Sequence, residues 1–373
     1  MIMLAYAGIA LLFLAVFPYI VYFIGISLGK PSEAPVLPED LPPVTIIISA
    51  YNEEQILPDR VRNLEESTYP REKLDLILVD DCSGDRTAEV AREALERSGF
   101  RFRIIRNPER MGTNRSYNRA IPLAGHPVVV TTDADVFFEP GALAMVVARL
   151  VSDESIVAVC SDLRPVPQAT GTAAYESVYR GFYGRMCDWE SRVDSTYNFN
   201  GALVAFRKDR VSRIEDRRGA DDANTAFEAI RRGFRAVYEI HAVVYEYIPP
   251  HFSLQYRQKI RRAKRLIEAT LSNLDLLGRP RPFSRYFYPL RIFMYLASPA
   301  LFFAGLILGG AGIFLLSPSL FIALAVAVAL GWLAWQGNFP LAFALNQFYL
   351  LAGLLHLPGE SRTWESTTKR ITG

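Results

Sequence analysis

Two long stretches of this 373-residue sequence contain no charged residue: residues 1–29 and residues 292–357 lack Asp, Glu, Lys and Arg. A charge-free run of 66 residues exceeds any single element of a globular core, so a purely soluble protein is excluded. The block 30–291 contains 75 of the 80 charges. Its 262 residues suffice for a water-soluble domain with its own core, which excludes a protein built only of membrane helices.

Cysteine and net charge are also scarce. The three cysteines are odd in number and scattered, so the sequence contains no disulfide framework and no Cys pair for a metal. Lys and Arg number 41 against 39 Asp and Glu, and this balance argues against nucleic acid as a partner. Hydrophobic residues make up 50% of the sequence, which excludes a disordered chain.

The charge-free segments predict a multi-pass protein of the cell membrane with a cytoplasmic catalytic domain. Residues 1–29 are long enough to cross a hydrocarbon core of about 30 Å, and no basic start marks them as a cleaved signal. A proline-rich linker follows at 30–43, and a basic amphipathic region at 251–291 is expected to lie in the membrane interface. Residues 292–357 are expected to form two or three spans, before a tail at 358–373. The side of the tail stays open, because three spans place it outside whereas its basic residues favour the inside.

Strands and helices alternate in the first half of the charged block. Buried strands are predicted at 44–49, 74–81, 102–107 and 127–135, with amphipathic helices between them. This rhythm predicts an α/β fold with a mostly parallel, Rossmann-like sheet and helices on both faces. Farther along, the pattern predicts helices near 172–191, 221–233 and 252–271 and a strand at 202–208. The catalytic domain is expected to cover residues 44–250.

Acidic residues cluster where the predicted parallel strands end. Asp80 and Asp81 end the second strand, and Asp133 and Asp135 end the fourth. Ligands of open α/β sheets bind at these carboxyl ends. Two carboxylates suit Mg²⁺ or Mn²⁺, which can take its other ligands from phosphates and water. The alternative is a solvated surface, since an Asp-x-Asp pair alone is a weak signal.

A further acidic pair, Asp221-Asp222, opens the predicted helix at 221–233. In one interpretation these residues cap the helix and face its dipole. In the other, one of them is a general base that takes a proton from an acceptor hydroxyl.

Five segments in series resemble one known family. They are TIIISAYNEE (45–54), LILVDDCSGDRT (76–87), TTDAD (131–135), GADDANTAFEAIRRGFRAVY (219–238) and RQKIRR (257–262). Together they resemble the membrane-bound family 2 glycosyltransferases with the GT-A fold, which include hyaluronan, chitin and cellulose synthases and many lipid-directed transferases. The resemblance runs from about residue 44 to 265.

The resemblance implies a role for each matching residue. Residues implied to bind the nucleotide-sugar are Ser49, Tyr51, Glu53, Asp80, Asp81 and Asp133. Asp135, with Asp133, would bind the divalent metal. Asp222 would be the catalytic base, and Gln258, Arg261 and Arg262 match a motif that closes over the diphosphate. Asn200 and Gly201 would line the acceptor pocket, where Asp221 is also placed.

Two departures from the family bear on the product. Arg262 stands where the family usually has a Trp that is associated with polymer synthases. The family's GK after the third strand is replaced by GTN at 112–114, so Arg110 or Arg115 would have to supply the positive charge. The absence of the Trp puts polymerisation in doubt.

The sequence therefore predicts a membrane-embedded, metal-dependent, inverting glycosyltransferase. Its donor is expected to be a nucleotide-sugar, specifically a UDP-sugar, and its acceptor a polyprenyl phosphate, a glycolipid or a lipid-linked saccharide. A metal and an Arg fork would stabilise the leaving diphosphate, and one base suffices for inversion. Three alternatives stay open: a processive polysaccharide synthase, a metal-dependent nucleotidyltransferase and an inactive membrane scaffold.

Overall fold

The computed structural model describes residues 1–373 except 168–170, 217–220, 249–251, 335–338 and 357–373. The chain divides into two compact units, which are treated separately. The sheet unit contains Pro31–Val166 and Cys187–Gln255, and the helical unit contains Met1–Lys30, Pro167–Met186 and Tyr256–Leu357. The predicted tail at 358–373 falls outside the described residues.

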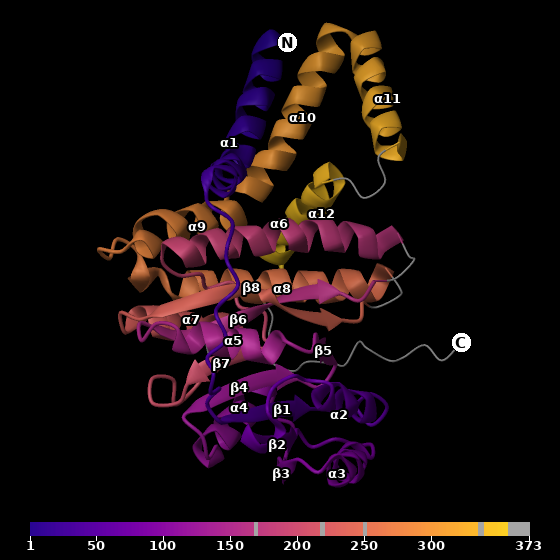
Figure 1. Ribbon diagram of the computed structural model, residues 1–373. Coiled ribbons are helices and arrows are strands. Elements are labelled where there is room, and N and C mark those ends of the chain that lie inside the picture. The colour runs from indigo at the N-terminus through magenta and orange to yellow at the C-terminus, as the bar shows by residue number, and fades with distance from the viewer. Residues whose placement is uncertain (168–170, 217–220, 249–251, 335–338, 357–373) are drawn as a thin grey trace. The chain divides into compact units, whose positions relative to one another are not determined.

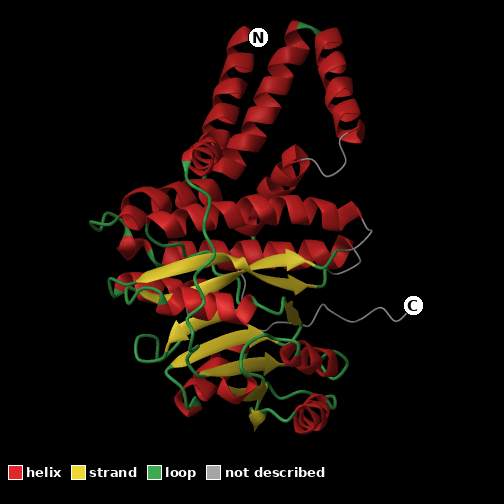
Figure 2. Ribbon diagram, in the orientation of Figure 1, coloured by secondary structure: helices red, strands yellow, loops and turns green. Residues whose placement is uncertain are grey.

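The sheet unit is built on eight described strands that form a single mixed sheet (Figures 1 and 2). Their order in the sheet is β3-β2-β1-β4-β7-β6-β8-β5. The strands are β1 (Val44–Ala50), β2 (Leu74–Asp80), β3 (Arg101–Arg106), β4 (Val128–Asp133), β5 (Val136–Phe138), β6 (Ile156–Pro165), β7 (Val204–Arg207) and β8 (Arg235–Glu246).

Helices cover both faces of this sheet. The helices of the unit are α2 (Leu57–Glu65), α3 (Thr87–Ser98), α4 (Thr113–Ala120), α5 (Ala142–Val151) and α7 (Asp221–Arg231). One hydrophobic core joins alternate strand residues such as Ile46 and Leu76 to apolar residues of α2, α3 and α5. The residues between them, such as Ile47 and Ile77, have side chains on the other face of the sheet and are also buried. Burial on both faces explains why these strands read as continuous β-branched runs.

The predicted α/β fold is confirmed. Strands β3, β2, β1 and β4 pair in parallel, as the alternation of strands and helices predicts. The second half differs in detail, because β7 pairs antiparallel with both β4 and β6, and β5 pairs antiparallel with β8. Helix α3 ends at Gly99, which has the left-handed conformation (φ +72°) that glycine adopts at low cost.

The helical unit contains α1 (Ile2–Leu28) and most of α6 (Gly171–Val193) and α8 (Phe252–Ser272). It continues with α9 (Tyr288–Leu296), α10 (Ser298–Leu316), α11 (Pro318–Ala334) and α12 (Phe339–Leu355). Helices α1 and α10 lie side by side along a line of small residues (Figure 1). A Cβ built on Gly8 would fall 2.2 Å from the backbone nitrogen of Gly309, so the two backbones touch only because neither position has a side chain. Such close contacts between small residues are typical of paired membrane helices.

Among the described residues, α1 and α10 are the two helices that are both long and apolar enough to cross a membrane. Only 22% of either hydrophobic window is buried. Large apolar side chains such as Met3, Ile9 and Ile307 are exposed on them, as expected for helices that face lipid. Helix α12 and the apolar part of α11 are shorter.

Candidate active site

The carboxyl ends of three neighbouring parallel strands bring the predicted nucleotide-binding residues to one edge of the sheet. Ala50 at the end of β1 is in register with Asp80 at the end of β2. One residue earlier on β1, Ser49 is in register with Asp133 at the end of β4. Three residues predicted from separate motifs, Ser49, Asp80 and Asp133, therefore share one edge, which is where an open α/β sheet binds its ligands.

The loops after β1 and β2 are joined by reciprocal hydrogen bonds. The Asn52 amide donates to the Ser83 hydroxyl (3.0 Å), and the Gly84 amide donates back to the Asn52 side chain (2.9 Å). The Glu53 amide donates to the Thr87 hydroxyl (2.8 Å). The left-handed conformation of Asn52 (φ 55°), which Asn tolerates better than most residues, allows this exchange. Tyr51 and Glu53 are thus held in a fixed loop.

Asp81 is buried and accepts hydrogen bonds from the loop that follows β3. Its two carboxylate oxygens accept the Met111 and Gly112 amides, each at 2.8 Å, and one oxygen also accepts the Asn107 side chain at 2.6 Å. Asp81 therefore shapes this loop. In the same loop, the Arg110 guanidinium lies 3.8 Å from the centre of the Tyr51 ring, so a cation and an aromatic ring stack beside the sheet edge.

Asp133 and Asp135 flank a short turn between β4 and β5. Both are partly buried, whereas Ala134 between them is buried. The buried Tyr117 of α4 donates its hydroxyl to Asp133 at 3.4 Å. Burial raises the pKa of Tyr117 well above its usual value, and the charges of Asp133 and Asp222 raise it further. Tyr117 therefore lies within electrostatic reach of both the Asp-Ala-Asp turn and the predicted base.

Asp222 is the second residue of α7 and lies against Gly201. A Cβ built on Gly201 would fall 2.6 Å from both Asp222 carboxylate oxygens, and Gly201 has a φ of +69°. Asn200 fixes this loop, because its side chain donates to the Ser161 carbonyl (2.8 Å) and accepts the Ala202 amide (3.1 Å). The structure thus brings Asn200, Gly201 and Asp222 together, while the side chain of Asp221 lies outside the described residues.

The remaining predicted residues lie on α8, in the helical unit. Gln258 and Arg261 are partly buried there, and Arg262 is exposed. Their neighbour Lys259 pairs with Glu176 of α6, and Arg180 also pairs with that carboxylate at 2.8 Å. This buried ion cluster ties α8 to α6 within the helical unit.

Sequence reasoning missed Arg60, whose side chain is fully buried on α2. Its guanidinium donates to Thr132, the residue before Asp133, at 3.2 Å. The signal is visible in the sequence in hindsight: Arg60 occupies the helical stripe formed by Leu57, Val61 and Leu64, all three of which are buried. A charge within such a stripe needs a polar partner inside the fold.

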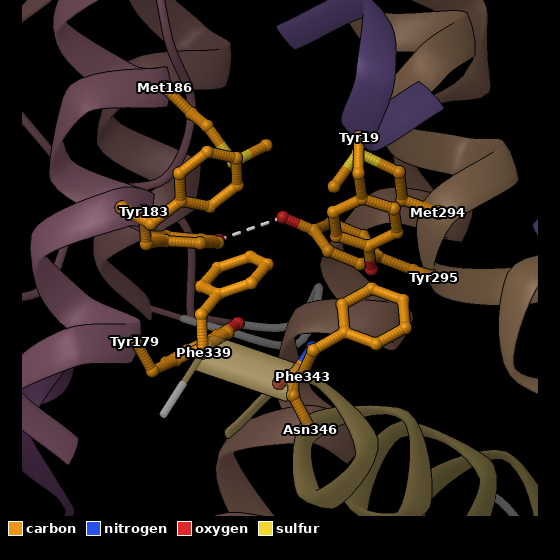
Figure 3. Close-up of a pocket in the computed structure, with 10 residues that line it drawn as sticks. Tyr19, Tyr179, Tyr183, Met186, Met294, Tyr295, Phe339, Phe343 and Asn346 are labelled. Atoms are coloured by element: carbon orange, nitrogen blue, oxygen red, sulfur yellow. Dashed lines mark hydrogen bonds between the residues drawn. The ribbon is translucent and has the colours of Figure 1, made fainter. Parts of the chain in front are cut away.

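The helical unit contains a small pocket lined by aromatic side chains (Figure 3). Its lining comes from α1, α6, α9 and α12: Tyr19, Tyr179, Phe182, Tyr183, Met186, Met294, Tyr295, Phe339, Phe343 and Asn346. The hydroxyls of Tyr183 and Tyr295 hydrogen-bond to each other at 2.8 Å (Figure 3). With these hydroxyls paired, the pocket presents a largely apolar surface.

The donor set at the sheet edge fits a divalent cation that binds together with a phosphate ligand. Asp133 and Asp135 supply carboxylate oxygens, the type of ligand that Mg²⁺ and Mn²⁺ prefer. Within the described parts of the chain, no group of three or more His, Cys, Asp or Glu residues could hold a metal ion. A cation at Asp133 and Asp135 would therefore need further ligands from phosphate and water.

Comparison with known proteins agrees with this geometry. Residues 45–203 match the Glycosyl transferase family 2 domain. The chain is 26% identical over 235 residues to the probable glycosyltransferase YdaM of Bacillus subtilis (strain 168), covering 61% of this chain and 56% of the relative. It is 22% identical over 264 residues to the poly-beta-1,6-N-acetyl-D-glucosamine synthase of Staphylococcus aureus (strain COL), covering 70% and 63%. The chain thus spans less than two thirds of the length of these curated relatives.

A solved structure is similar over nearly the whole chain. It is the mannosyltransferase PcManGT from Pyrobaculum calidifontis in complex with GDP-Man and Mn²⁺, with a TM-score of 0.79 and 26% sequence identity. The similarity covers 95% of this chain and 98% of that chain. The sheet order, the matched segment and this likeness agree, and residues 45–203 form a family 2 glycosyltransferase domain with a GT-A-like fold.

Proposed function

We propose that this protein is a membrane-embedded, metal-dependent glycosyltransferase that transfers one sugar from a nucleoside-diphosphate sugar to a membrane-associated acceptor with inversion. The observation that carries the proposal is the placement of Asp222 on Gly201, apart from the Asp-Ala-Asp turn and linked to it electrostatically by Tyr117. We assign proton transfer to Asp222 and cation binding to Asp133 and Asp135. This division of roles is what a single displacement requires.

In the proposed reaction, Asp222 accepts the proton of an acceptor hydroxyl as its oxygen bonds to the anomeric carbon. The bond from that carbon to the diphosphate oxygen breaks, and the nucleoside diphosphate leaves. A divalent cation held by Asp133 and Asp135 would neutralise charge on the leaving diphosphate. Arg261 and Arg262 are proposed to contact the same group, and a retaining route would need a second carboxylate as nucleophile.

A base at Asp222 favours one class of acceptor over another. A phosphate monoester is already ionised near neutral pH and attacks without losing a proton to the enzyme, whereas a sugar hydroxyl needs a base. A glycolipid or lipid-linked saccharide is therefore proposed ahead of a polyprenyl phosphate.

Two donors deserve priority in an assay. PcManGT, which is similar over 95% of this chain, binds GDP-Man, and this supports GDP-mannose. The sequence itself favours a UDP-sugar, and the name of the staphylococcal relative supports an N-acetylglucosamine donor. The apolar helices α1 and α10 support a membrane location, and we propose the multi-pass arrangement with a cytoplasmic sheet unit that the sequence predicts.

The proposal is tested with the purified full chain in lipid nanodiscs, Mn²⁺ and radiolabelled GDP-mannose, UDP-N-acetylglucosamine or UDP-glucose. The acceptors are a glycolipid with free sugar hydroxyls and, separately, a polyprenyl phosphate. One labelled sugar on the glycolipid, lost in Asp222→Asn, is expected. A polymer would identify the processive alternative, and transfer of the nucleotide label would identify a nucleotidyltransferase. Equal transfer to polyprenyl phosphate by Asp222→Asn and the unsubstituted protein would exclude Asp222 as an essential base for that acceptor.

A further inference from the structure

Arg60 is a charged residue in the interior of the sheet unit. Its exposed fraction is 0%, whereas Arg62, two residues farther along the same helix, has a side chain that is 66% exposed. Placing an ionised group in a protein interior is costly unless other groups stabilise its charge. The contacts of Arg60 show which groups do so.

These contacts lie on both sides of the Asp-Ala-Asp turn. One guanidinium nitrogen donates to the hydroxyl of Thr132, which directly precedes Asp133, at 3.2 Å. The guanidinium carbon also lies 4.0 Å from the ring centre of Phe138, which follows the turn on β5. Arg60 therefore connects the strand that enters the turn with the strand that leaves it.

Asn63, one helical turn after Arg60, completes this connection. Its side-chain oxygen accepts a hydrogen bond from Arg60 at 2.9 Å and another from the Phe138 amide at 2.7 Å. Its side-chain nitrogen donates to the Phe138 carbonyl at 2.9 Å. Thr132 in turn donates to the Ala202 carbonyl at 2.6 Å, next to the glycine that supports Asp222. The guanidinium is thus at the centre of a network that reaches the turn and the residue after Gly201.

Arg60 makes no ion pair within the described part of the chain, and its Nε has no hydrogen-bond partner there. Burial lowers the pKa of Arg60 to about 9, and the charges of Asp135 and Asp133 act against this shift. The guanidinium is therefore still charged at neutral pH, and the two carboxylates of the turn are the negative charges that favour it most.

We propose that Arg60 is an internal counter-ion of the Asp133–Asp135 turn, and that it makes cation binding depend on the nucleotide. With no metal bound, its positive charge offsets the mutual repulsion of the two carboxylates and holds the turn in place. The same charge repels a divalent cation that arrives alone. A cation that arrives with a diphosphate carries compensating negative charge, so the repulsion is largely removed. The inference rests on the proposed function, since it presupposes a metal and a nucleotide-sugar at this edge.

The test measures Mn²⁺ binding to the purified full chain by calorimetry, first alone and then with saturating GDP or UDP. In Arg60→Met, affinity for Mn²⁺ alone is expected to rise at least about fivefold, because a nearby positive charge is removed. Arg60→Lys keeps the charge and is expected to resemble the unsubstituted protein. Arg62→Met is the matched control on the solvent side of the same helix and should change nothing.

If Arg60 had a purely structural role, Arg60→Met would bind Mn²⁺ more weakly than the unsubstituted protein, since a disordered turn binds metal less well. Unchanged or weaker Mn²⁺ binding by Arg60→Met overturns the inference. If that variant does not fold, Arg60→Gln, which keeps a donor for Thr132, is measured in the same way. The unsubstituted protein provides a further check, because equal Mn²⁺ affinity with and without nucleotide also overturns the inference. Failure to bind any nucleotide would overturn the proposed function as well, whereas unchanged affinity in Arg60→Met overturns only the counter-ion role.

Discussion

The carboxylate of Asp222 lies so close to the α-carbon of Gly201 that no side chain fits between them. An added Cβ would be 2.6 Å from each carboxylate oxygen, whereas real Cβ atoms essentially never approach closer than 3.0 Å. Gly201 also has a left-handed φ of +69°. The base and the glycine therefore form one structural feature, and the glycine controls where the base can lie.

We expect Gly201→Ala to reduce turnover at least about tenfold, because the new methyl group displaces the Asp222 carboxylate. The substitution also adds backbone strain of about 1 kcal/mol. Gly99→Ala is the matched control, since Gly99 has nearly the same φ (+72°) but nothing within 4 Å of its added Cβ. Turnover and thermal stability of both variants are compared. Equal losses of turnover in the two variants would show that strain alone explains the effect.

Removal of a metal-binding carboxylate should abolish the metal dependence of nucleotide binding. For Asp135→Ala we expect nucleotide affinity in Mn²⁺ to fall at least about tenfold, to the level that the unsubstituted protein shows in EDTA. Asp209→Ala, whose side chain is 69% exposed, is the control and should keep its metal response. Calorimetric titration with GDP and UDP measures both. Full transfer activity in EDTA would rule out the metal role.

The contact between α1 and α10 should tolerate no side chain at Gly8. A Cβ there would meet the Gly309 backbone at 2.2 Å, so Gly8→Ala must push the helices apart and lose their close packing. We expect the melting temperature in detergent to fall by at least about 4 °C. Gly310→Ala, whose Cβ would make an ordinary 3.5 Å contact with Phe321, is the control on α10. A comparable fall in both variants would contradict the packing explanation.

The ion cluster at Glu176 predicts acid sensitivity. Burial alone would raise the pKa of Glu176, but the charges of Arg180 and Lys259 outweigh it and lower this pKa to about 2. In the unfolded chain the Glu176 carboxyl takes up its proton near pH 4.5. The stabilisation of the folded protein by ionised Glu176 is therefore complete above pH 4.5 and is lost as the pH falls towards 2. Glu176→Gln should therefore be less stable than the unsubstituted protein by roughly 2 to 3 kcal/mol near pH 7, and the gap should narrow below pH 4.5.

Thermal unfolding between pH 7 and pH 3 measures this gap. Glu93→Gln is the control, because the Glu93 side chain is 58% exposed and its ion pair with Arg86 is on the surface. A constant difference between Glu176→Gln and the unsubstituted protein across this range would show that the carboxyl group contributes no proton-linked stability.

The sequence predicted β1, β2 and β4 because each of these three strands is covered on both faces. Strands β1, β2 and β4 are therefore short, continuous runs of β-branched and apolar residues, a pattern that indicates buried parallel strands. The later strands are harder to recognise: the apolar residues of β8 are interrupted by Arg235, Glu239 and His241, and β5 has only three residues. Their identity depends on pairing partners far away in the sequence, which local pattern does not reveal.

The candidate site was predictable only where chemistry and strand ends coincide. Asp80, Asp133 and Asp135 follow apolar runs, so their position indicates their common edge. Arg60 looks like any other charge of an amphipathic helix until the fold shows that its neighbours Thr132 and Phe138 flank the turn. The roles of these residues in binding and catalysis stay predictions.

The pairing of α1 with α10 also has a consequence for biosynthesis. Helix α1 precedes the sheet unit in the chain, so α1 and every strand of the sheet unit are made before α10 appears. Until then the surface of Gly8 has no partner within its own chain, whereas the sheet unit can already fold, since domains tend to fold in order of synthesis. The packing of α1 against α10 can therefore form only after the sheet unit has been made, and a nascent chain interrupted before α10 would leave a folded sheet unit and an α1 without its partner helix.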